Sequence, residues 1–121
     1  MNPKAIVTAF LTAMERMDYD AALKCVSSDC EYTNLPMGTV TGSEGIRGVL
    51  EPFFAPIAEN EFKLLRMAVE GDVVFVERLD RHRVGDKWFE LPVAGVFEVR
   101  DGRITVWREY FDLGTLQRGL A

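Results

Sequence analysis

The sequence predicts an α+β fold, in which helices near the N-terminus cover a strongly curved, mixed or antiparallel sheet and enclose a pocket. Helical hydrophobic spacing marks the first half of the chain, and four extended runs mark the second, near 61–69, 73–84, 87–100 and 103–112. The runs are separated only by Gly71-Asp72, Gly85-Asp86 and Asp101-Gly102. Such short turns pair consecutive strands antiparallel, because a parallel crossover needs a dozen or more residues. Helices followed by an antiparallel meander are typical of α+β domains.

The first half is predicted to hold three helices and one short strand. The first helix begins near Pro3, which costs no hydrogen bond in a first turn, and its apolar side recurs at helical spacing in Ile6, Phe10, Leu11, Met14 and Met17. A second short helix covers 18–26, and the stretch 30–34 has strand-like Tyr and Thr before Pro36. The third helix begins within 41–44 and presents one apolar side, made of Ile46, Val49, Leu50, Phe53 and Phe54.

Composition narrows the class of protein. A chain of 121 residues predicts a single domain spanning 1–121, and a net charge of −5 argues against a nucleic-acid partner. No run approaches the roughly 18 apolar residues of a membrane span, and the first residues lack the pattern of a signal peptide. We therefore expect a cytoplasmic protein that does not bind membranes.

The sequence implies neither a metal nor a cofactor. Cys25 and Cys30 lie five residues apart without histidine partners at ligand spacing, so free thiols are expected. No glycine-rich phosphate loop is present.

The strand predicted over 73–84 carries the most informative polar pattern. Period-two alternation places Val74, Val76, Arg78, Asp80 and His82 on one face, which begins apolar and then becomes charged. Taken alone, the Arg–Asp pair is equally consistent with a surface ion pair worth about 0–1 kcal/mol. The only histidine of the chain lies toward the strand end, so we expect it at the rim or surface.

The last predicted strand offers a second carboxylate. One parity holds Ile104, Val106, Arg108, Tyr110 and Asp112, and the other holds Trp107, Glu109 and Phe111. The strands over 73–84 and 103–112 both flank 87–100, so Arg78, Asp80 and Asp112 are expected to converge. Two adjacent buried carboxylates cannot both ionise cheaply, and a planar guanidinium can bind both. The convergence would supply one general acid and one general base. A lysine in place of Arg78 would lack the planar, forked guanidinium that can bind both carboxylates.

Five polar positions together resemble the limonene-1,2-epoxide hydrolase family, which has an NTF2-like, SnoaL-like cone. The family carries Tyr-x-Asn, a later Arg-x-Asp and an Asp at the end of the last long strand. This chain has Tyr32-Thr33-Asn34, then Arg78-Leu79-Asp80, then Asp112 after Trp107-Arg108-Glu109-Tyr110-Phe111. The resemblance covers roughly residues 5–116, although the N-terminus is shorter than in the best-known members.

The resemblance implies a role for each of these residues. Asp112 would take a proton from a water held by Tyr32 and Asn34, while protonated Asp80 would protonate the epoxide oxygen and Arg78 would bridge the carboxylates. The expected substrate is a small apolar epoxide, and no cofactor is implied. The expected substrate-binding side chains are apolar: Leu50, Phe53, Leu65, Met67 and Val96.

Two other functions are open at this point. A steroid-isomerase-like or polyketide-cyclase-like enzyme would use a lone Asp base opposite an acidic Tyr or Asp, but Arg78 would ionise such an acid. A non-catalytic binding module would not need the complete polar set. In each case the outer sheet face needs cover, which predicts a homodimer through that face, with Trp107 and Phe97 against the core or the partner.

Overall fold

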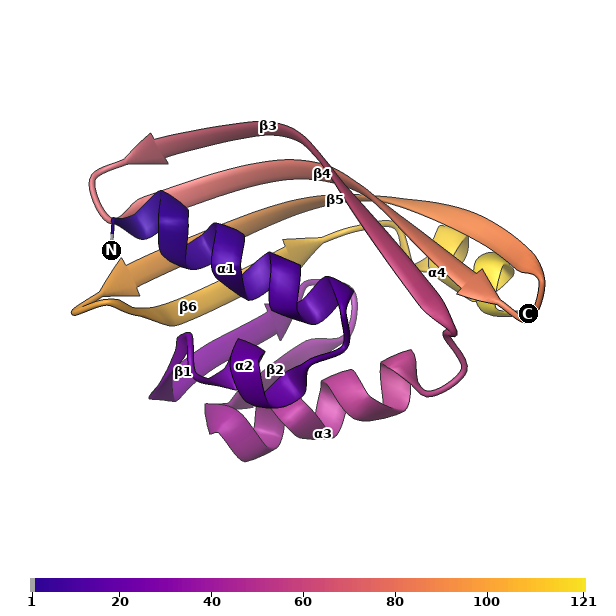
Figure 1. The fold of residues 1–121 in the computed structure, drawn as a ribbon, viewed down its shortest axis with the longest axis horizontal. Helices are drawn as coiled ribbons and strands as arrows, with labels where there is room; N and C mark the ends of the chain where they lie inside the picture. Colours follow the sequence, from indigo (N-terminus) through magenta and orange to yellow (C-terminus); the bar gives the residue numbers. More distant parts are fainter. Residues whose placement is uncertain (1) are drawn as a thin grey trace.

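The computed structural model describes residues 2–121 and consists of helices packed against one six-stranded sheet (Figure 1). The elements, in chain order, are α1 (Pro3–Glu15), α2 (Tyr19–Leu23), β1 (Val26–Asn34), β2 (Gly38–Thr41), α3 (Gly42–Phe54), β3 (Glu59–Glu70), β4 (Val73–Val84), β5 (Lys87–Arg100), β6 (Arg103–Tyr110) and α4 (Leu113–Leu120).

The sheet has the order β2-β1-β6-β5-β4-β3 and is mixed. The strands β3 to β6 form the predicted antiparallel meander, while β1 pairs parallel with β6. The turn between β5 and β6 holds Asp101 and Gly102 with φ of 52° and 77°, the left-handed backbone that an Asp-Gly hairpin turn requires. The predicted α+β class and the curved mixed sheet are confirmed.

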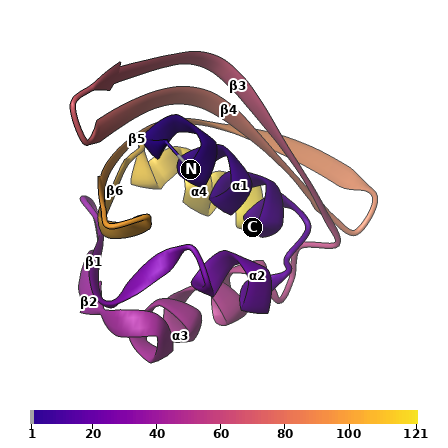
Figure 2. The same cartoon turned by 60° about the vertical axis from the view of Figure 1, so that its left-hand side comes forward.

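The sheet curves around the N-terminal helix. Figure 2 shows α1 inside the curve, with α2 and α3 on its open side, and α4 lies beside β5 at the far end. The main core fills the space between α1 and the sheet, where Phe10, Phe97 and Trp107 are fully buried. A smaller cluster of Leu91, Val93 and Leu116 joins β5 to α4.

Several predicted boundaries differ from the structure. The first strand begins at Val26 rather than near residue 30, and neither β2 nor α4 was predicted. The last strand ends at Tyr110, two residues earlier than expected. None of the helices within residues 2–121 combines the length and hydropathy that a membrane crossing requires.

A β-bulge in β6 changes which side chains face the core. Val99 pairs with Ile104 and Glu98 pairs with Val106, so Thr105 is the extra residue. The bulge shifts the alternation by one residue. As a result Ile104 and Trp107 are both fully buried, although simple alternation places them on opposite faces.

Candidate active site

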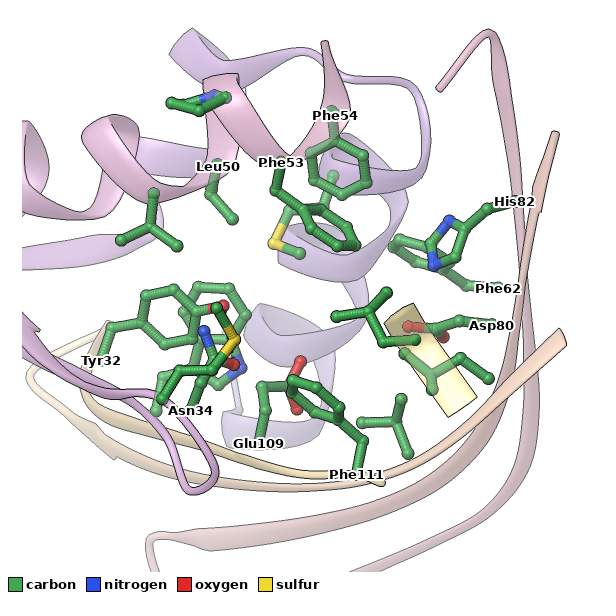
Figure 3. Close-up of a pocket in the computed structure, with 18 of the residues that line it drawn as sticks. Tyr32, Asn34, Leu50, Phe53, Phe54, Phe62, Asp80, His82, Glu109 and Phe111 are labelled. Atoms are coloured by element: carbon green, nitrogen blue, oxygen red, sulfur yellow. Dashed lines mark hydrogen bonds between the residues drawn. The ribbon is translucent and has the colours of Figure 1, made fainter. Parts of the chain in front are cut away.

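A cavity of about 440 Å³ lies between the concave face of the sheet and the helices α3 and α4 (Figure 3). Most of its wall is apolar. The apolar lining side chains are Met14, Met37, Val49, Leu50, Pro52, Phe53, Phe54, Phe62, Leu91, Val93, Trp107, Phe111 and Leu116. A pocket of this size with a few polar groups is typical of a small-molecule site.

The polar groups of the cavity come from three strands. Tyr32 and Asn34 lie on β1, whereas Arg78, Asp80 and His82 lie on β4, and Glu109 lies on β6. All six side chains are buried. Figure 3 shows Tyr32 and Asn34 on one side of the cavity, Asp80 and His82 on the other, and Glu109 with Phe111 along the sheet side.

Arg78 joins two carboxylates through four hydrogen bonds. Its Nε and Nη2 donate to Oδ1 and Oδ2 of Asp80 at 2.8 and 3.0 Å. Its Nη2 and Nη1 donate to Oε1 and Oε2 of Glu109 at 2.6 and 3.1 Å. Both contacts are bidentate, the geometry in which a guanidinium binds carboxylates most strongly. The guanidinium therefore fixes the orientation of both acids.

The arginine reaches Glu109 across the intervening strand at a glycine. Gly95 of β5 pairs with Val76 of β4 and with Glu109 of β6. A Cβ at this position would lie 2.8 Å from Oε2 of Glu109 and 3.2 Å from Nη1 of Arg78. The missing side chain provides the space in which the Arg78–Glu109 pair forms.

Burial determines the protonation of this cluster. Burial raises the pKa of Glu109, against the lowering effect of the Arg78 guanidinium. Burial would lower the pKa of Arg78, but Glu109 and Asp80 outweigh it, so the pKa rises and the arginine stays charged. The protonated form of Glu109 is therefore favoured more than it would be at the surface, because a second negative charge beside Arg78 is costly in a dry site.

Tyr32 and Asn34 are held beside Glu109 by the parallel pairing of β1 and β6. In that register Asn34 lies opposite Glu109 and Tyr32 lies opposite Trp107. The Tyr32 ring stacks on Trp107 with centroids 3.7 Å apart, and its hydroxyl donates to Oδ1 of Asn34 at 3.1 Å. Burial, with the nearby Glu109 charge, raises the pKa of Tyr32, so the hydroxyl keeps its proton.

Asp112 does not face the cavity, so its predicted place beside Arg78 is wrong. Its side chain is 72% exposed and caps α4, accepting hydrogen bonds from the backbone N–H and the hydroxyl of Thr115 at 2.9 and 2.7 Å. These bonds lower its pKa. The physical reason is that β6 ends at Tyr110, so Asp112 begins a helix instead of completing a strand. Glu109 occupies the position expected for Asp112.

The expectation that His82 lies at the rim is also wrong. The imidazole is 1% exposed and lines the cavity. Rings of Phe53, Phe54, Phe62 and Phe89 surround it at centroid distances of 5.2–6.3 Å. The end of α3 and the start of β3 cover this part of β4, which the position of the residue within its strand did not indicate.

Of the five apolar side chains expected to bind substrate, the two on α3 lie in the cavity wall and the three on the sheet do not. Leu50 and Phe53 line the cavity. Leu65 lies at a bulge in the edge strand β3 and is 48% exposed. Met67 pairs with Val76 and packs against the main core instead. Val96 pairs with exposed Phe75 and faces outward, because the buried side chains of β5 are the odd-numbered ones.

Glu109 was missed because the last strand was expected to reach residue 112, which made Asp112 the carboxylate at its end, whereas β6 ends at Tyr110. A usable signal was present, since Glu109 lies two residues from both Trp107 and Phe111 and shares their parity. A carboxylate between two large apolar residues of one strand face is a candidate for a buried, functional acid.

No metal cluster is found within residues 2–121, where no three His, Cys, Asp or Glu side chains are grouped to hold an ion. Cys25 and Cys30 are free thiols, and Cys30 is buried.

Comparisons with known proteins agree in family and fold. The sequence model of the limonene-1,2-epoxide hydrolase catalytic domain matches residues 1–121. Epoxide hydrolase EphG of Mycobacterium tuberculosis (strain ATCC 25618 / H37Rv) is 34% identical over 114 residues, which cover 94% of this chain and 76% of EphG.

Solved structures are also similar to this chain in fold. An M. tuberculosis LEH-like epoxide hydrolase has a TM-score of 0.82 at 34% identity, covering 96% of this chain and 86% of that one. A putative SnoaL-like polyketide cyclase from Shewanella denitrificans OS-217 has a TM-score of 0.87 at 16% identity, covering 98% and 96%, and shows the fold alone. The predicted NTF2-like, SnoaL-like cone is confirmed.

Proposed function

Since the chain belongs to the limonene-1,2-epoxide hydrolase family and is an epoxide hydrolase of that type, we propose that it adds water to small apolar epoxides in one step, with Glu109 as general base and Asp80 as general acid. The supporting observation is the bidentate bridge of Arg78 to both carboxylates inside an apolar cavity. The product is a vicinal diol, and no covalent ester with the enzyme forms.

Glu109 is assigned as the base because of its neighbours. A water molecule beside its carboxylate can accept a hydrogen bond from the amide of Asn34 and donate one to Tyr32 Oη, because the Tyr32 hydroxyl proton points to Asn34. The other water proton moves to Glu109 as the water oxygen attacks an epoxide carbon. The raised pKa of Glu109 strengthens it as a base relative to an ordinary glutamate.

Asp80 is assigned as the acid because it lies on the opposite side of the cavity from Tyr32 and Asn34. Its proton passes to the epoxide oxygen as the C–O bond breaks, so attack and protonation come from opposite sides. Acid and base assistance contribute roughly 10²–10⁴-fold each. After turnover Glu109 holds a proton and Asp80 lacks one. Arg78 binds both in either state, and a proton must return to Asp80 before the next cycle.

The walls of the cavity favour an uncharged substrate. Beyond the six polar side chains its lining is aliphatic or aromatic, with Phe53 and Phe54 opposite the sheet. An apolar ring or chain gains burial there, whereas a charged group finds no free counter-charge because Arg78 is already bound to both acids.

Diol formation from limonene oxide, cyclohexene oxide and styrene oxide tests the proposal. We expect turnover by the wild type and a loss of at least about 10²-fold in Asp80→Asn and in Glu109→Gln, because each variant removes one proton-transfer group. Asp112→Asn is the matched control: it also neutralises a carboxylate near the end of β6, keeps a helix-capping side chain and should retain full activity.

The opposite pattern would refute the assignment. If folded Glu109→Gln hydrolysed these epoxides at the wild-type rate while Asp112→Asn did not, Glu109 would not be the base. A single turnover in ¹⁸O-labelled water separates the chemical routes: one-step attack puts the label in the first diol formed, whereas an ester intermediate on unlabelled enzyme would give an unlabelled first product.

We also propose that two copies of the chain associate through the outer face of the sheet. This face carries exposed Phe75 and Tyr110 near Ala94 and Val96. An apolar centre on an open sheet face favours cover by a second copy.

A further inference from the structure

The only histidine of the chain lies in the cavity without a function in the proposed reaction. His82 follows Asp80 by two residues on the same face of β4, and Figure 3 shows both on the same side of the cavity. Two strand residues span about 6.5 Å. The imidazole therefore lies one strand step away from the carboxyl group that is assigned to the epoxide oxygen.

Hydrogen bonds on the far side of the ring define which nitrogen carries the proton. Nδ1 of His82 lies 2.7 Å from Oδ1 of Asn60, and Nδ2 of Asn60 donates to the backbone carbonyl of Glu15 at 3.4 Å. The carbonyl can only accept, so the amide nitrogen of Asn60 faces Glu15 and its oxygen faces the ring. Nδ1 of His82 is then the donor, and Nε2 carries a lone pair.

That lone pair has no partner within residues 2–121, although Nε2 is buried. Burial lowers the pKa of His82 more than the nearby Asp80 raises it, and Arg78 lowers it further. The ring is therefore neutral. The other groups around the ring are phenyl rings, which offer no hydrogen for Nε2 to accept. An unpaired acceptor in an apolar cavity costs free energy that a leucine would not cost.

We propose that Nε2 of His82 accepts a hydrogen bond from a hydroxyl group of the substrate. The preferred substrate is then an epoxide that also carries an alcohol group about 6.5 Å from the epoxide oxygen. This inference rests on the proposed function and specifies its substrate class. Because Nε2 can only accept, the site distinguishes a hydroxyl donor from an ether or ketone of the same shape. His82 is thus a specificity-determining residue.

A matched set of epoxides tests the preference. The 1,2-epoxide of α-terpineol carries a hydroxyl group across the ring, its methyl ether lacks the donor, and the 1,2-epoxide of p-menth-1-ene has hydrogen at that position. We expect kcat/KM to be about tenfold higher for the alcohol than for either analogue, because one hydrogen bond to a buried acceptor contributes a difference of about that size. In His82→Leu this preference should disappear while hydrolysis of the p-menth-1-ene epoxide persists.

A second variant tests the direction of the hydrogen bond. Asn60→Asp places a carboxylate against Nδ1, which favours the imidazolium and turns Nε2 into a donor. The alcohol and the methyl ether should then have similar kcat/KM values, both above that of the p-menth-1-ene epoxide, because a hydroxyl oxygen and an ether oxygen can both accept. Equal kcat/KM for all three epoxides in the wild type would overturn the inference, as would an alcohol preference that persists in folded His82→Leu.

A binding measurement separates this inference from the proposed function. Because His82 is the only histidine, protein labelled with ¹⁵N-histidine gives one pair of ring signals. We expect the Nε2 signal to shift when α-terpineol, which has no epoxide, is added, and not with p-menth-1-ene. A shift without hydrolysis of any epoxide would contradict only the proposed function, whereas hydrolysis with no shift at saturating alcohol would contradict only the role of His82.

Discussion

At the scale of single residues, the cluster of Arg78, Asp80 and Glu109 depends on a side chain that is missing. The two carboxylates lie on β4 and β6, with the whole of β5 between them. Neighbouring strands are about 4.8 Å apart, so the guanidinium has to cross β5 directly over its backbone. Gly95 is the residue at that crossing. Its role is to allow close approach, which no larger residue permits.

Gly95→Ala should therefore disrupt the site more than the fold. The new methyl group would lie 2.8 Å from Glu109 Oε2 and 3.1 Å from Cε1 of Phe97, so the Arg78–Glu109 pair must separate. We expect kcat/KM for epoxide hydrolysis to fall by at least about 10²-fold, since misplacement by 1 Å can have that effect. The free energy of unfolding should fall by about 1–3 kcal/mol.

Parallel assays of diol formation and thermal unfolding distinguish these effects. A folded Gly95→Ala protein with wild-type kcat/KM would show that the Arg78–Glu109 contact is not required for turnover. A protein that fails to unfold cooperatively would instead show that the glycine is mainly structural.

At the scale of elements, local patterns predicted the hairpins and failed where a strand changed its alternation. The turn at Asp101-Gly102 follows from the backbone these residues adopt, and it formed as predicted. The bulge at Thr105 and the end of β6 at Tyr110 depend on the pairing partner and on packing by α4. Those are tertiary effects. The alternation within β4 therefore predicted that Arg78 and Asp80 share a face, whereas the parity that Glu109 shares with Trp107 and Phe111 did not by itself show that β6 ends before Asp112.

The helix α4 closes one end of the cavity and is held by a second close approach. Leu116 lines the cavity, and a Cβ on Gly119 would overlap the ring of Phe89 on β5. Gly119→Ala should therefore displace α4 or Phe89 and lower the free energy of unfolding by about 1–3 kcal/mol, despite the better helix propensity of alanine.

Gly114→Ala is the matched control in the same helix. There the added methyl group meets only the ends of the Arg118 and Asp112 side chains at 3.2 Å and beyond, and Arg118 is exposed. Thermal or urea unfolding should show Gly114→Ala close to the wild type and Gly119→Ala clearly destabilised. Equal stability of the two variants would mean that α4 adjusts its position freely.

At the scale of the whole molecule, the cone provides an enclosed space and the side chains decide the chemistry. The same fold, at 16% identity and a TM-score of 0.87, occurs in a putative polyketide cyclase. A fold that supports several different reactions does not by itself identify the reaction of any one member. Here the assignment depends on two acids, a bridging arginine and the pair Tyr32 and Asn34, which no element of the fold requires.

The outer face of the sheet is the remaining feature of the whole molecule that calls for a partner. Phe75 is 47% exposed and Tyr110 is 42% exposed, and both face away from the cavity. The ion pair of Arg66 and Glu77, at 2.7 Å, lies beside this apolar centre. An apolar centre with charged neighbours is the arrangement found at protein–protein interfaces.

Phe75→Asp should convert a dimer into a monomer, because burying a carboxylate at the apolar centre of the interface costs free energy. Light scattering after size-exclusion chromatography measures the mass at micromolar concentration. The control is Val69→Asp, which introduces the same charge at a residue that is 45% exposed and pairs with inward-facing Val74. Loss of the dimer in both variants would mean that the outer face is not what holds the dimer together, and a monomeric wild type would refute the association. Because Phe75 lies on the opposite face from Asp80, the monomer should keep its hydrolase activity if the cavity is complete within one chain.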